Sequence, residues 1–264
     1  MGRIEKKFTE LRTGNKKALI VYITAGDPSI EVTKQILPVL EKAGADIIEV
    51  GVPFSDPTAD GPVIQAASQR ALKAGTTLQD VLAMIGEVRR TSQIPFVLFG
   101  YFNPIFTYGM ERFARDAAQV GVDGILVVDL PPEEAFALRV YTDAAGLDFI
   151  SLVAPTTGTE RLKKIVRSAA GFVYYISITG VTGTAAPEIQ NIAREVGKIR
   201  KHTDMPVAVG FGISTAAQAG QIGSLADGVV IGSSLVRLIE THGHTQGFIP
   251  AIRDYITEMK AALG

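Results

Sequence analysis

Two carboxylate side chains at the end of a short apolar segment are the residues of this chain best suited to chemistry. Glu49 lies in the apolar segment 45–50, which is typical of a strand, and Asp60 lies in the loop that follows. A carboxylate near the end of a buried strand is costly unless it has a task, because an unpaired buried charge is strongly destabilising. Three prolines stiffen the loop. We therefore predict that Glu49 and Asp60 form an acid/base pair, in which one carboxyl group is protonated and the other is anionic.

Glycine-bearing turns in the last third of the chain indicate a phosphate site. They occupy residues 179–184, 210–214 and 232–234, each after a predicted strand. Glycine lets backbone N–H groups approach an anion closely, and a helix N-terminus favours negative charge. One such turn would be an ordinary connection, but three that converge favour phosphate binding. Their hydroxyl groups belong to Ser214, Ser233 and Ser234.

Other polar residues at the ends of the predicted strands allow two interpretations each. Asp129 either caps a helix or has a function, and Asp56 either fixes its loop, faces a partner or takes part in catalysis. Asn103 precedes a proline, which favours a turn. Tyr101 and Tyr175 are more typical of a pocket wall than of chemistry.

The elements that must position these residues alternate along the chain. Short apolar segments without strict alternation are typical of strands buried on both faces, and amphipathic segments between them are typical of helices. The predicted strands are residues 18–24, 46–51, 95–101, 124–129, 148–153, 171–177, 206–210 and 228–232. The predicted helices are residues 29–42, 77–91, 110–120, 132–145, 159–168, 187–201, 215–222 and 235–241.

Eight strand–helix units without a linker predict an α/β fold, a (β/α)8 TIM barrel in which residues 1–264 form a single domain. An open doubly wound sheet is the alternative, but no Gly-x-Gly-x-x-Gly follows the first strand. Three segments exceed the repeat. They are an N-terminal helix over 2–12 that closes the bottom of the barrel, a short helix over 64–74, and a C-terminal helix over 248–263.

Composition excludes several classes of function. The net charge of −1 argues against binding to nucleic acid or to an anionic membrane, and the absence of cysteine excludes disulfides, thiolate metal sites and a cysteine nucleophile. The three histidines lie away from the strand ends, and no spacing of His, Asp and Glu predicts a metal site. Residues 1–17 carry charges of both signs, unlike a signal peptide, and the longest apolar run, 18–25, is too short to span a membrane. We expect a soluble, cytoplasmic protein.

Residues 49–65, EVGVPFSDPTADGPVIQ, closely resemble the signature of the tryptophan synthase alpha subunit family. Similar motifs follow in the family's order: TAGDP at 24–28, YFNP at 101–104, GVTG at 180–183 and GFGI at 210–213. The resemblance therefore extends over nearly the whole chain. It implies a lyase of tryptophan biosynthesis that cleaves indole-3-glycerol phosphate to indole and glyceraldehyde 3-phosphate by a retro-aldol reaction.

The resemblance also implies roles for individual residues. Glu49 matches the general acid/base that protonates indole C3 and is implicated in removing the proton of the glycerol hydroxyl. Asp60 matches the carboxylate that accepts the indole N–H, and Tyr175 matches a tyrosine beside the acid/base. The substrate- and phosphate-binding positions would be Thr182, Gly183, Phe211, Gly212, Gly232 and Ser233. An apolar pocket that accepts indole would include Phe99, Val127, Phe211 and Ile231.

A partner follows from the same resemblance. The alpha chain of this family caps a beta subunit in an alpha2beta2 heterotetramer, and indole passes between the two through a tunnel. Pyridoxal phosphate belongs to the beta subunit, so this chain is expected to bind no cofactor and no metal. The loops over 53–60 and 179–187 would be mobile elements that couple the subunits allosterically. The expected partner-facing or loop positions are Pro53, Asp56, Pro57 and Pro132.

Three alternatives stay open. A barrel isomerase acting on a phosphoribosyl amine would place acid/base groups at the ends of the first and fifth strands, where this chain has Thr24-Ala25-Gly26 and Val153-Ala154-Pro155. A non-enzymatic cap for a beta subunit would not need Glu49 and Asp60. A stand-alone lyase that releases free indole is compatible with the sequence.

Overall fold

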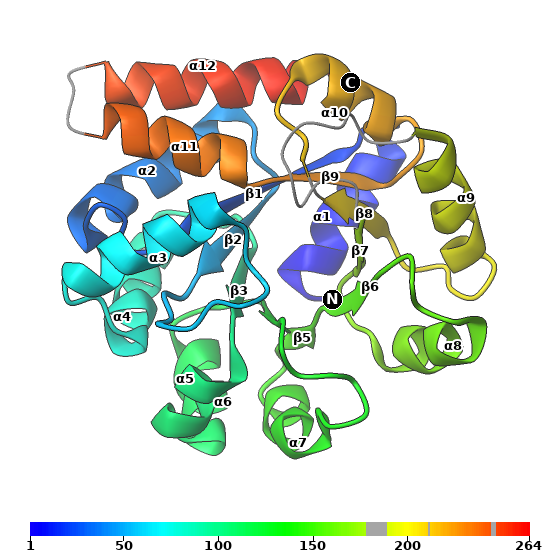
Figure 1. Cartoon of the computed structure of the whole chain (residues 1–264), viewed down its shortest axis with the longest axis horizontal. Coiled ribbons are helices and arrows are strands. Elements are labelled where there is room, and N and C mark those ends of the chain that lie inside the picture. Colours follow the sequence, from blue (N-terminus) through cyan, green and yellow to red (C-terminus); the bar gives the residue numbers. More distant parts are fainter. Residues whose placement is uncertain (178–188, 211, 244–246) are drawn as a thin grey trace.

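The chain forms a ring of parallel strands surrounded by helices (Figure 1). The computed structural model describes residues 1–177, 189–210, 212–243 and 247–264. The strands pair in the order β5-β4-β3-β2-β1-β9-β8-β7-β6, and every pair is parallel. Their bounds are β1 (Ala18–Thr24), β2 (Ile47–Gly51), β3 (Phe96–Gly100), β4 (Gly124–Val127), β5 (Asp148–Phe149), β6 (Ser151–Val153), β7 (Val173–Ile176), β8 (Val207–Gly210) and β9 (Gly228–Ile231).

The fifth strand of the barrel is divided into β5 and β6 at Ile150. The first piece pairs with β4 and the second pairs with β7, so the chain itself closes the ring at this point. The prediction of a (β/α)8 barrel is confirmed, with the fifth strand in two parts.

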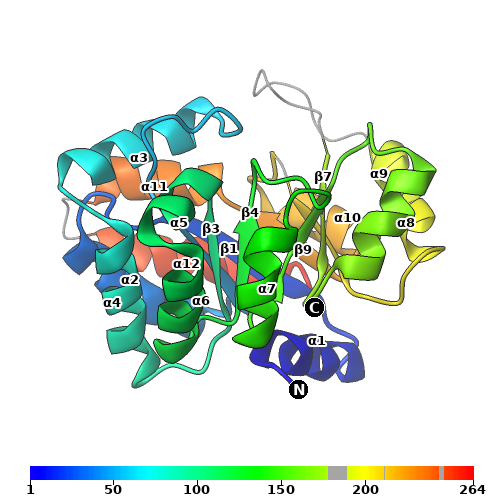
Figure 2. The same ribbon diagram turned by 90° about the horizontal axis from the view of Figure 1, so that it is seen from below.

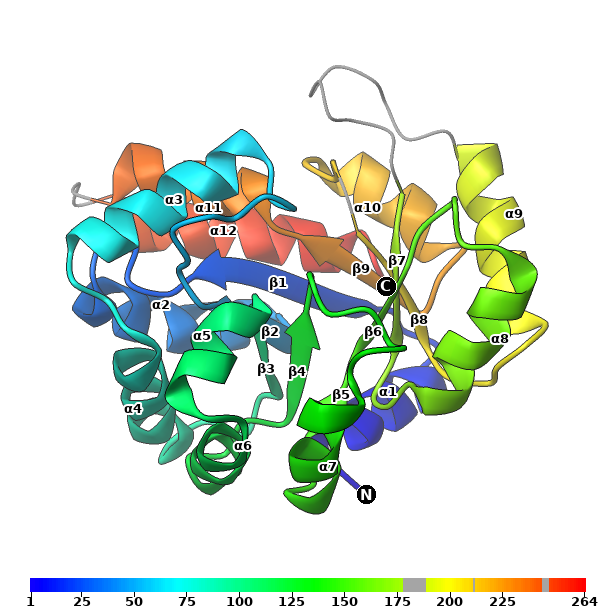
Figure 3. The same ribbon diagram turned by 60° about the horizontal axis from the view of Figure 1, so that its bottom comes forward.

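Helices cover the outside of the ring, as Figures 1 and 3 show. Two expectations were wrong. A helix, α5, occupies the segment expected to be a turn at Asn103, because Pro104 in its first turn needs no N–H partner there. The helix expected from 132 begins only at Phe136. The helices are α1 (Arg3–Thr13), α2 (Ile30–Ala43), α3 (Pro62–Lys73), α4 (Leu78–Arg89), α5 (Phe102–Tyr108), α6 (Met110–Gln119), α7 (Phe136–Ala144), α8 (Thr159–Ser168), α9 (Ile189–Arg200), α10 (Ala216–Gly223), α11 (Ser233–His242) and α12 (Phe248–Ala261).

The core has two layers separated by the strands. One lies between strands and helices, and the other fills the barrel interior with residues such as Ile20, Ile47 and Val97. Helix α1 closes the interior layer from below (Figure 2). Its Phe8 packs against Phe172, with ring centroids 5.7 Å apart. The expected bottom-closing helix is thus confirmed. In the part of the chain that the structure describes, no helix is long and apolar enough to cross a membrane.

Aspartates fasten the lower ends of the strands. Each stands just before or at the start of a strand, and its carboxylate accepts the N–H group at the start of the preceding strand. The pairs are Asp46 with Leu19 (2.7 Å), Asp123 with Phe96 (2.8 Å) and Asp227 with Val207 (2.9 Å). Because the bottom of such barrels serves stability, these bonds fix the frame on which the upper loops stand.

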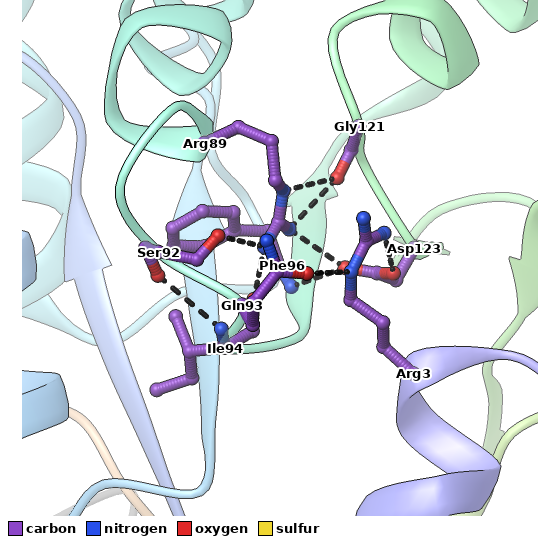
Figure 4. A network of polar contacts seen from close by, with 8 residues as sticks. All are labelled: Arg3, Arg89, Ser92, Gln93, Ile94, Phe96, Gly121 and Asp123. Atoms are coloured by element: carbon purple, nitrogen blue, oxygen red, sulfur yellow. Dashed lines mark hydrogen bonds and ion pairs between the residues drawn. The ribbon is translucent and has the colours of Figure 1, made fainter.

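Asp123 lies at the centre of the polar network in Figure 4. Arg89 and Arg3 both pair with it at 2.9 Å, and Arg89 also donates to the carbonyl of Gly121 and lies over the Phe96 ring. The network joins α1 to the connections before β3 and β4.

Candidate active site

Glu49 projects from β2 into the barrel, on the face it shares with Ile47. Its side chain is buried, with the residue 1% exposed, and neither carboxylate oxygen has a hydrogen-bond partner among the described residues. Apart from the hydroxyl of Ser177, these are the only buried side-chain polar atoms without a partner in the described ranges. Removal from water disfavours the charged form and raises the pKa of Glu49 to about 8. Glu49 is therefore protonated at neutral pH and is able to donate a proton.

Asp60 stands in the loop between β2 and α3, where Tyr101, the residue directly after β3, orients it. The Tyr101 hydroxyl donates to its carboxylate at 3.0 Å and accepts the N–H of Ala59 at 3.0 Å. Gln65 donates to the Asp60 carbonyl at 2.8 Å. Burial raises the pKa of Asp60 to about 6, opposed by the hydrogen bond from Tyr101, which lowers it. Asp60 is thus largely anionic at neutral pH.

The pKa values of two tyrosines in the barrel interior, Tyr22 and Tyr174, are affected by both carboxylates. Burial is the largest cause that raises the pKa of Tyr22 and of Tyr174, and the charges of Glu49 and Asp60 contribute to both. Glycines make room for the rings, because a Cβ atom at Gly51 would overlap the Tyr22 hydroxyl and one at Gly210 would overlap that of Tyr174. The carboxylates and tyrosines therefore face one mouth of the barrel.

The expected tyrosine beside the acid/base is Tyr174 and not Tyr175. Tyr175 points to the outer layer, where the charges of Glu195 and Arg194 of α9 act on it. Successive side chains of a strand point to opposite faces, so the correction amounts to one residue. Val127 and Ile231 lie in the outer layer for the same reason, whereas Phe99 faces the mouth with its ring 5.1 Å from that of Tyr22.

The expected phosphate positions are described in part. Gly212 has φ +71°, in the region that favours glycine, and Ser233 begins α11 after Gly232. Gly232 stands against the Tyr22 side chain, which brings the N-terminus of α11 to the mouth that holds the carboxylates. Ser233 is exposed, and its hydroxyl has no hydrogen-bond partner in the described ranges. Thr182, Gly183 and Phe211 lie outside the described residues.

Residues 8–263 match the sequence profile of the family "Tryptophan synthase alpha chain". The chain belongs to this family. The tryptophan synthase alpha chain of Geotalea daltonii is 56% identical over 240 residues, which cover 91% of each chain, and that of Geotalea uraniireducens is 52% identical over 91% of this chain and 90% of the relative.

Solved structures of the family share the fold. Tryptophan synthase subunit alpha from Legionella pneumophila has a TM-score of 0.93 and 39% identity, covering 100% of this chain and 98% of that one. A chain of tryptophan synthase from M. tuberculosis, in an aminoacrylate-bound form, has a TM-score of 0.90 and 36% identity over 100% of both chains.

The residues expected to face a partner differ in exposure. Asp56 is exposed and accepts a hydrogen bond from Ser55 at 2.5 Å, and Pro57 and Pro132 are half-buried. Pro53 is buried, so it serves the loop and does not present a surface to a partner in this conformation.

Two further residues at the mouth have partners that the sequence did not reveal. Asp129 accepts the N–H of Phe102 at 2.7 Å, in the first turn of α5, and not an N–H of the helix that follows it in the sequence. Asp27 forms an ion pair with Arg70, which also contacts Glu240. Only the YFNP and TAGDP motifs marked these segments, and neither motif indicates the partner residue.

A hollow of about 410 Å³ lies at the opposite end of the barrel, away from Glu49 and Asp60. It stands where α8 and α9 end, and its cations complement the partial negative charge of the two helix C-termini. This explains the charge without a ligand. Its lining residues are Lys163, Val166, Arg167, Arg200, Lys201, His202, Thr203 and Asp204. Among all the described residues, the hollow included, no group of three or more His, Cys, Asp or Glu side chains could hold a metal ion.

Proposed function

We propose that Glu49 and Asp60 of this chain cleave indole-3-glycerol phosphate to indole and glyceraldehyde 3-phosphate, as the alpha subunit does in tryptophan biosynthesis. The chain is accordingly a carbon–carbon lyase. The observation that carries the proposal is the opposite protonation of two carboxyl groups at one barrel mouth, with pKa values of about 8 and about 6. Placing a proton on an aryl carbon needs the first group, and stabilising the ring cation needs the second.

The proposed reaction balances with these two groups. Glu49 gives its proton to indole C3, and the positive charge that forms on the ring is stabilised by Asp60, which accepts the indole N–H. The Glu49 carboxylate then takes the proton of the glycerol hydroxyl next to the scissile bond. The C–C bond breaks, its electron pair restores the aromatic ring, and the hydroxyl carbon becomes the aldehyde of glyceraldehyde 3-phosphate.

Tyr174 and the phosphate turns would hold the substrate. The hydroxyl of Tyr174 shares the interior with Glu49, which suits it to contact the reacting part of the substrate. Ser233 and the N–H groups at the start of α11 would bind the phosphate, with Gly212 and Gly232 allowing close approach. Thr182, Gly183 and Phe211 are proposed to complete the site.

We also propose a beta subunit as the partner, in an alpha2beta2 complex in the cytoplasm. Large apolar side chains are exposed on the helices that follow β3 and β4: Phe106 is 60% exposed on α5, and Phe136 and Val140 are 78% and 50% exposed on α7. With Asp56 and Pro132, they give a surface that suits a protein partner. Pyridoxal phosphate would belong to that partner, and this chain would hold no cofactor.

Indole release from indole-3-glycerol phosphate tests the function. The purified chain is assayed alone and with a tryptophan synthase beta subunit, with Glu49→Gln as the control. We expect slow release that rises strongly with the beta subunit. Fast release by the chain alone would identify a stand-alone lyase, and no release in either assay would refute the assignment of Glu49 and Asp60.

A further inference from the structure

A hydrogen bond joins the C-terminal helix to the turn that begins α11. The hydroxyl of Tyr255, on α12, lies 2.6 Å from the hydroxyl of Ser234, in the first turn of α11. Both side chains are half-buried. The bond therefore connects a helix that is surplus to the barrel repeat with the proposed phosphate end of the site.

The same two hydroxyls reach the turn after β8. Ser234 donates to the carbonyl of Ile213 at 3.3 Å, and the Tyr255 hydroxyl lies 3.4 Å from the carbonyl of Ser214. Since the Ser234 proton goes to Ile213, the short bond between the hydroxyls is donated by Tyr255. Tyr255 thus stands where the turns after β8 and β9 meet.

These bonds divide the three serines of the two turns into separate roles. Ser234 is occupied by Ile213 and Tyr255, and the hydroxyl and N–H of Ser214 are both directed at Gln218, at 3.3 and 2.9 Å. Of these three serines, only Ser233 has a hydroxyl left for a ligand among the described residues. Ser234 and Ser214 therefore hold the turns in place, although the hydroxyls of all three were counted in favour of phosphate binding from the sequence.

Helix α12 is held in place by other elements, so the Tyr255 side chain that it carries has a defined position. The helix packs on α2, α10 and α11, as Figure 1 shows. Near its end, Lys260 donates to Asp46 at 2.6 Å and to the carbonyl of Lys17 at 3.0 Å. The Asp46 carboxylate also accepts the N–H of Leu19, so α12 is fastened to the base of β1.

We propose that Tyr255 is a positioning residue for phosphate binding. Through Ser234 it sets the spacing between the turns after β8 and β9, so that the Ser233 hydroxyl and the N-terminus of α11 meet the phosphate together. This inference rests on the proposed phosphate site. Loss of one neutral hydrogen bond corresponds to roughly a three- to tenfold change in a binding constant.

Substitution of the two hydroxyls tests the proposal. Tyr255→Phe and Ser234→Ala are each expected to raise the KM for indole-3-glycerol phosphate, and the inhibition constant of inorganic phosphate, by roughly three- to tenfold. The kcat should change by less than about twofold, because neither residue touches the reacting carbons. The effects of the two substitutions should be less than additive in the double variant, since both remove the bond between the two hydroxyls.

Tyr108→Phe is the matched control, because its hydroxyl donates to Asp116 at 2.9 Å outside the site. It should leave both constants unchanged. A Tyr255→Phe variant with a lower Tm but unchanged KM and phosphate inhibition would overturn the proposal, as would additive effects in the double variant. Ser233→Ala separates this result from the larger hypothesis: if it leaves phosphate inhibition unchanged, the phosphate site itself is wrong and the role of Tyr255 is refuted with it.

Discussion

Arg70 holds Asp27 through its Nε and Nη2 atoms, which donate hydrogen bonds of 2.7 and 2.8 Å to the two carboxylate oxygens. Asp27 is 3% exposed and lies in the loop after β1, whereas Arg70 lies on α3, the helix that leaves the Asp60 loop. A third bond, 2.6 Å long, joins Arg70 to Glu240 of α11. Helices α3 and α11 lie side by side over β1 (Figure 3), so one arginine ties together three elements of the barrel mouth.

Removal of Arg70 should destabilise the fold. Arg70→Met leaves the buried Asp27 carboxylate without its partner, which costs about 3 kcal/mol of unfolding free energy. Arg70→Lys keeps the charge but loses the planar fork and should cost less. Glu240→Gln is the control, because it removes only an exposed pair and should cost less than about 1 kcal/mol. Urea unfolding measures all three, and equal losses for Arg70→Met and Glu240→Gln would contradict this account.

Glu49→Gln should abolish turnover and leave substrate binding largely intact. The amide fits the same space but has no proton to give, and general acid/base groups contribute roughly 10²- to 10⁴-fold to rate. Single-turnover kinetics and a direct binding assay with indole-3-glycerol phosphate separate the two effects. A variant that fails to bind substrate would show that Glu49 has a structural role.

The stability of the protein should fall between about pH 5 and pH 8 because of Glu49. Its pKa rises from 4.5 to about 8 on folding, so in this range the folded state binds more protons than the unfolded state. The free energy of unfolding then decreases with rising pH, by up to about 1.4 kcal/mol per pH unit. Glu49→Gln removes the part of the slope that Glu49 contributes, which is the larger part above about pH 6. Parallel pH curves for the two proteins, measured by urea unfolding, would show that the carboxyl group is not held protonated.

The pH profile of kcat/KM should be bell-shaped, with limbs near pH 6 and pH 8. Activity needs Asp60 ionised and Glu49 protonated, and these pKa values are about 6 and about 8. Tyr101→Phe removes the hydrogen bond that lowers the pKa of Asp60, so it should move the acid limb to higher pH. Tyr108→Phe should leave the limb in place. An acid limb that ignores Tyr101→Phe would belong to another group.

The sequence was sufficient for most of the strands and helices, although not for α5, and it failed where a choice of face was needed. Strands such as β4, β7 and β9 are apolar on both sides, so nothing in their composition tells which alternate residues face inward. Tyr175, Val127 and Ile231 were assigned to the interior for this reason, although the structure turns them outward. Glu49 was not affected by this ambiguity, because a single carboxylate in an apolar strand stands out from the sequence whichever way its neighbours face.

Contacts between distant segments were also beyond the sequence. Arg70 and Tyr255 are ordinary surface-type residues of their helices, and only packing brings them to Asp27 and Ser234. That residues 1–264 form a single domain stays a prediction.

The position of helix α1 in the fold constrains the order in which the chain folds during synthesis. It precedes every strand, yet its apolar side chains belong to one core cluster with strand residues from throughout the chain, from Ile20 to Val230. During synthesis, the segment emerges long before Phe172 and Val230 exist, and it has no complete surface to pack on until the last strand is made. The barrel is therefore closed last by a helix that is synthesised before any of its strands.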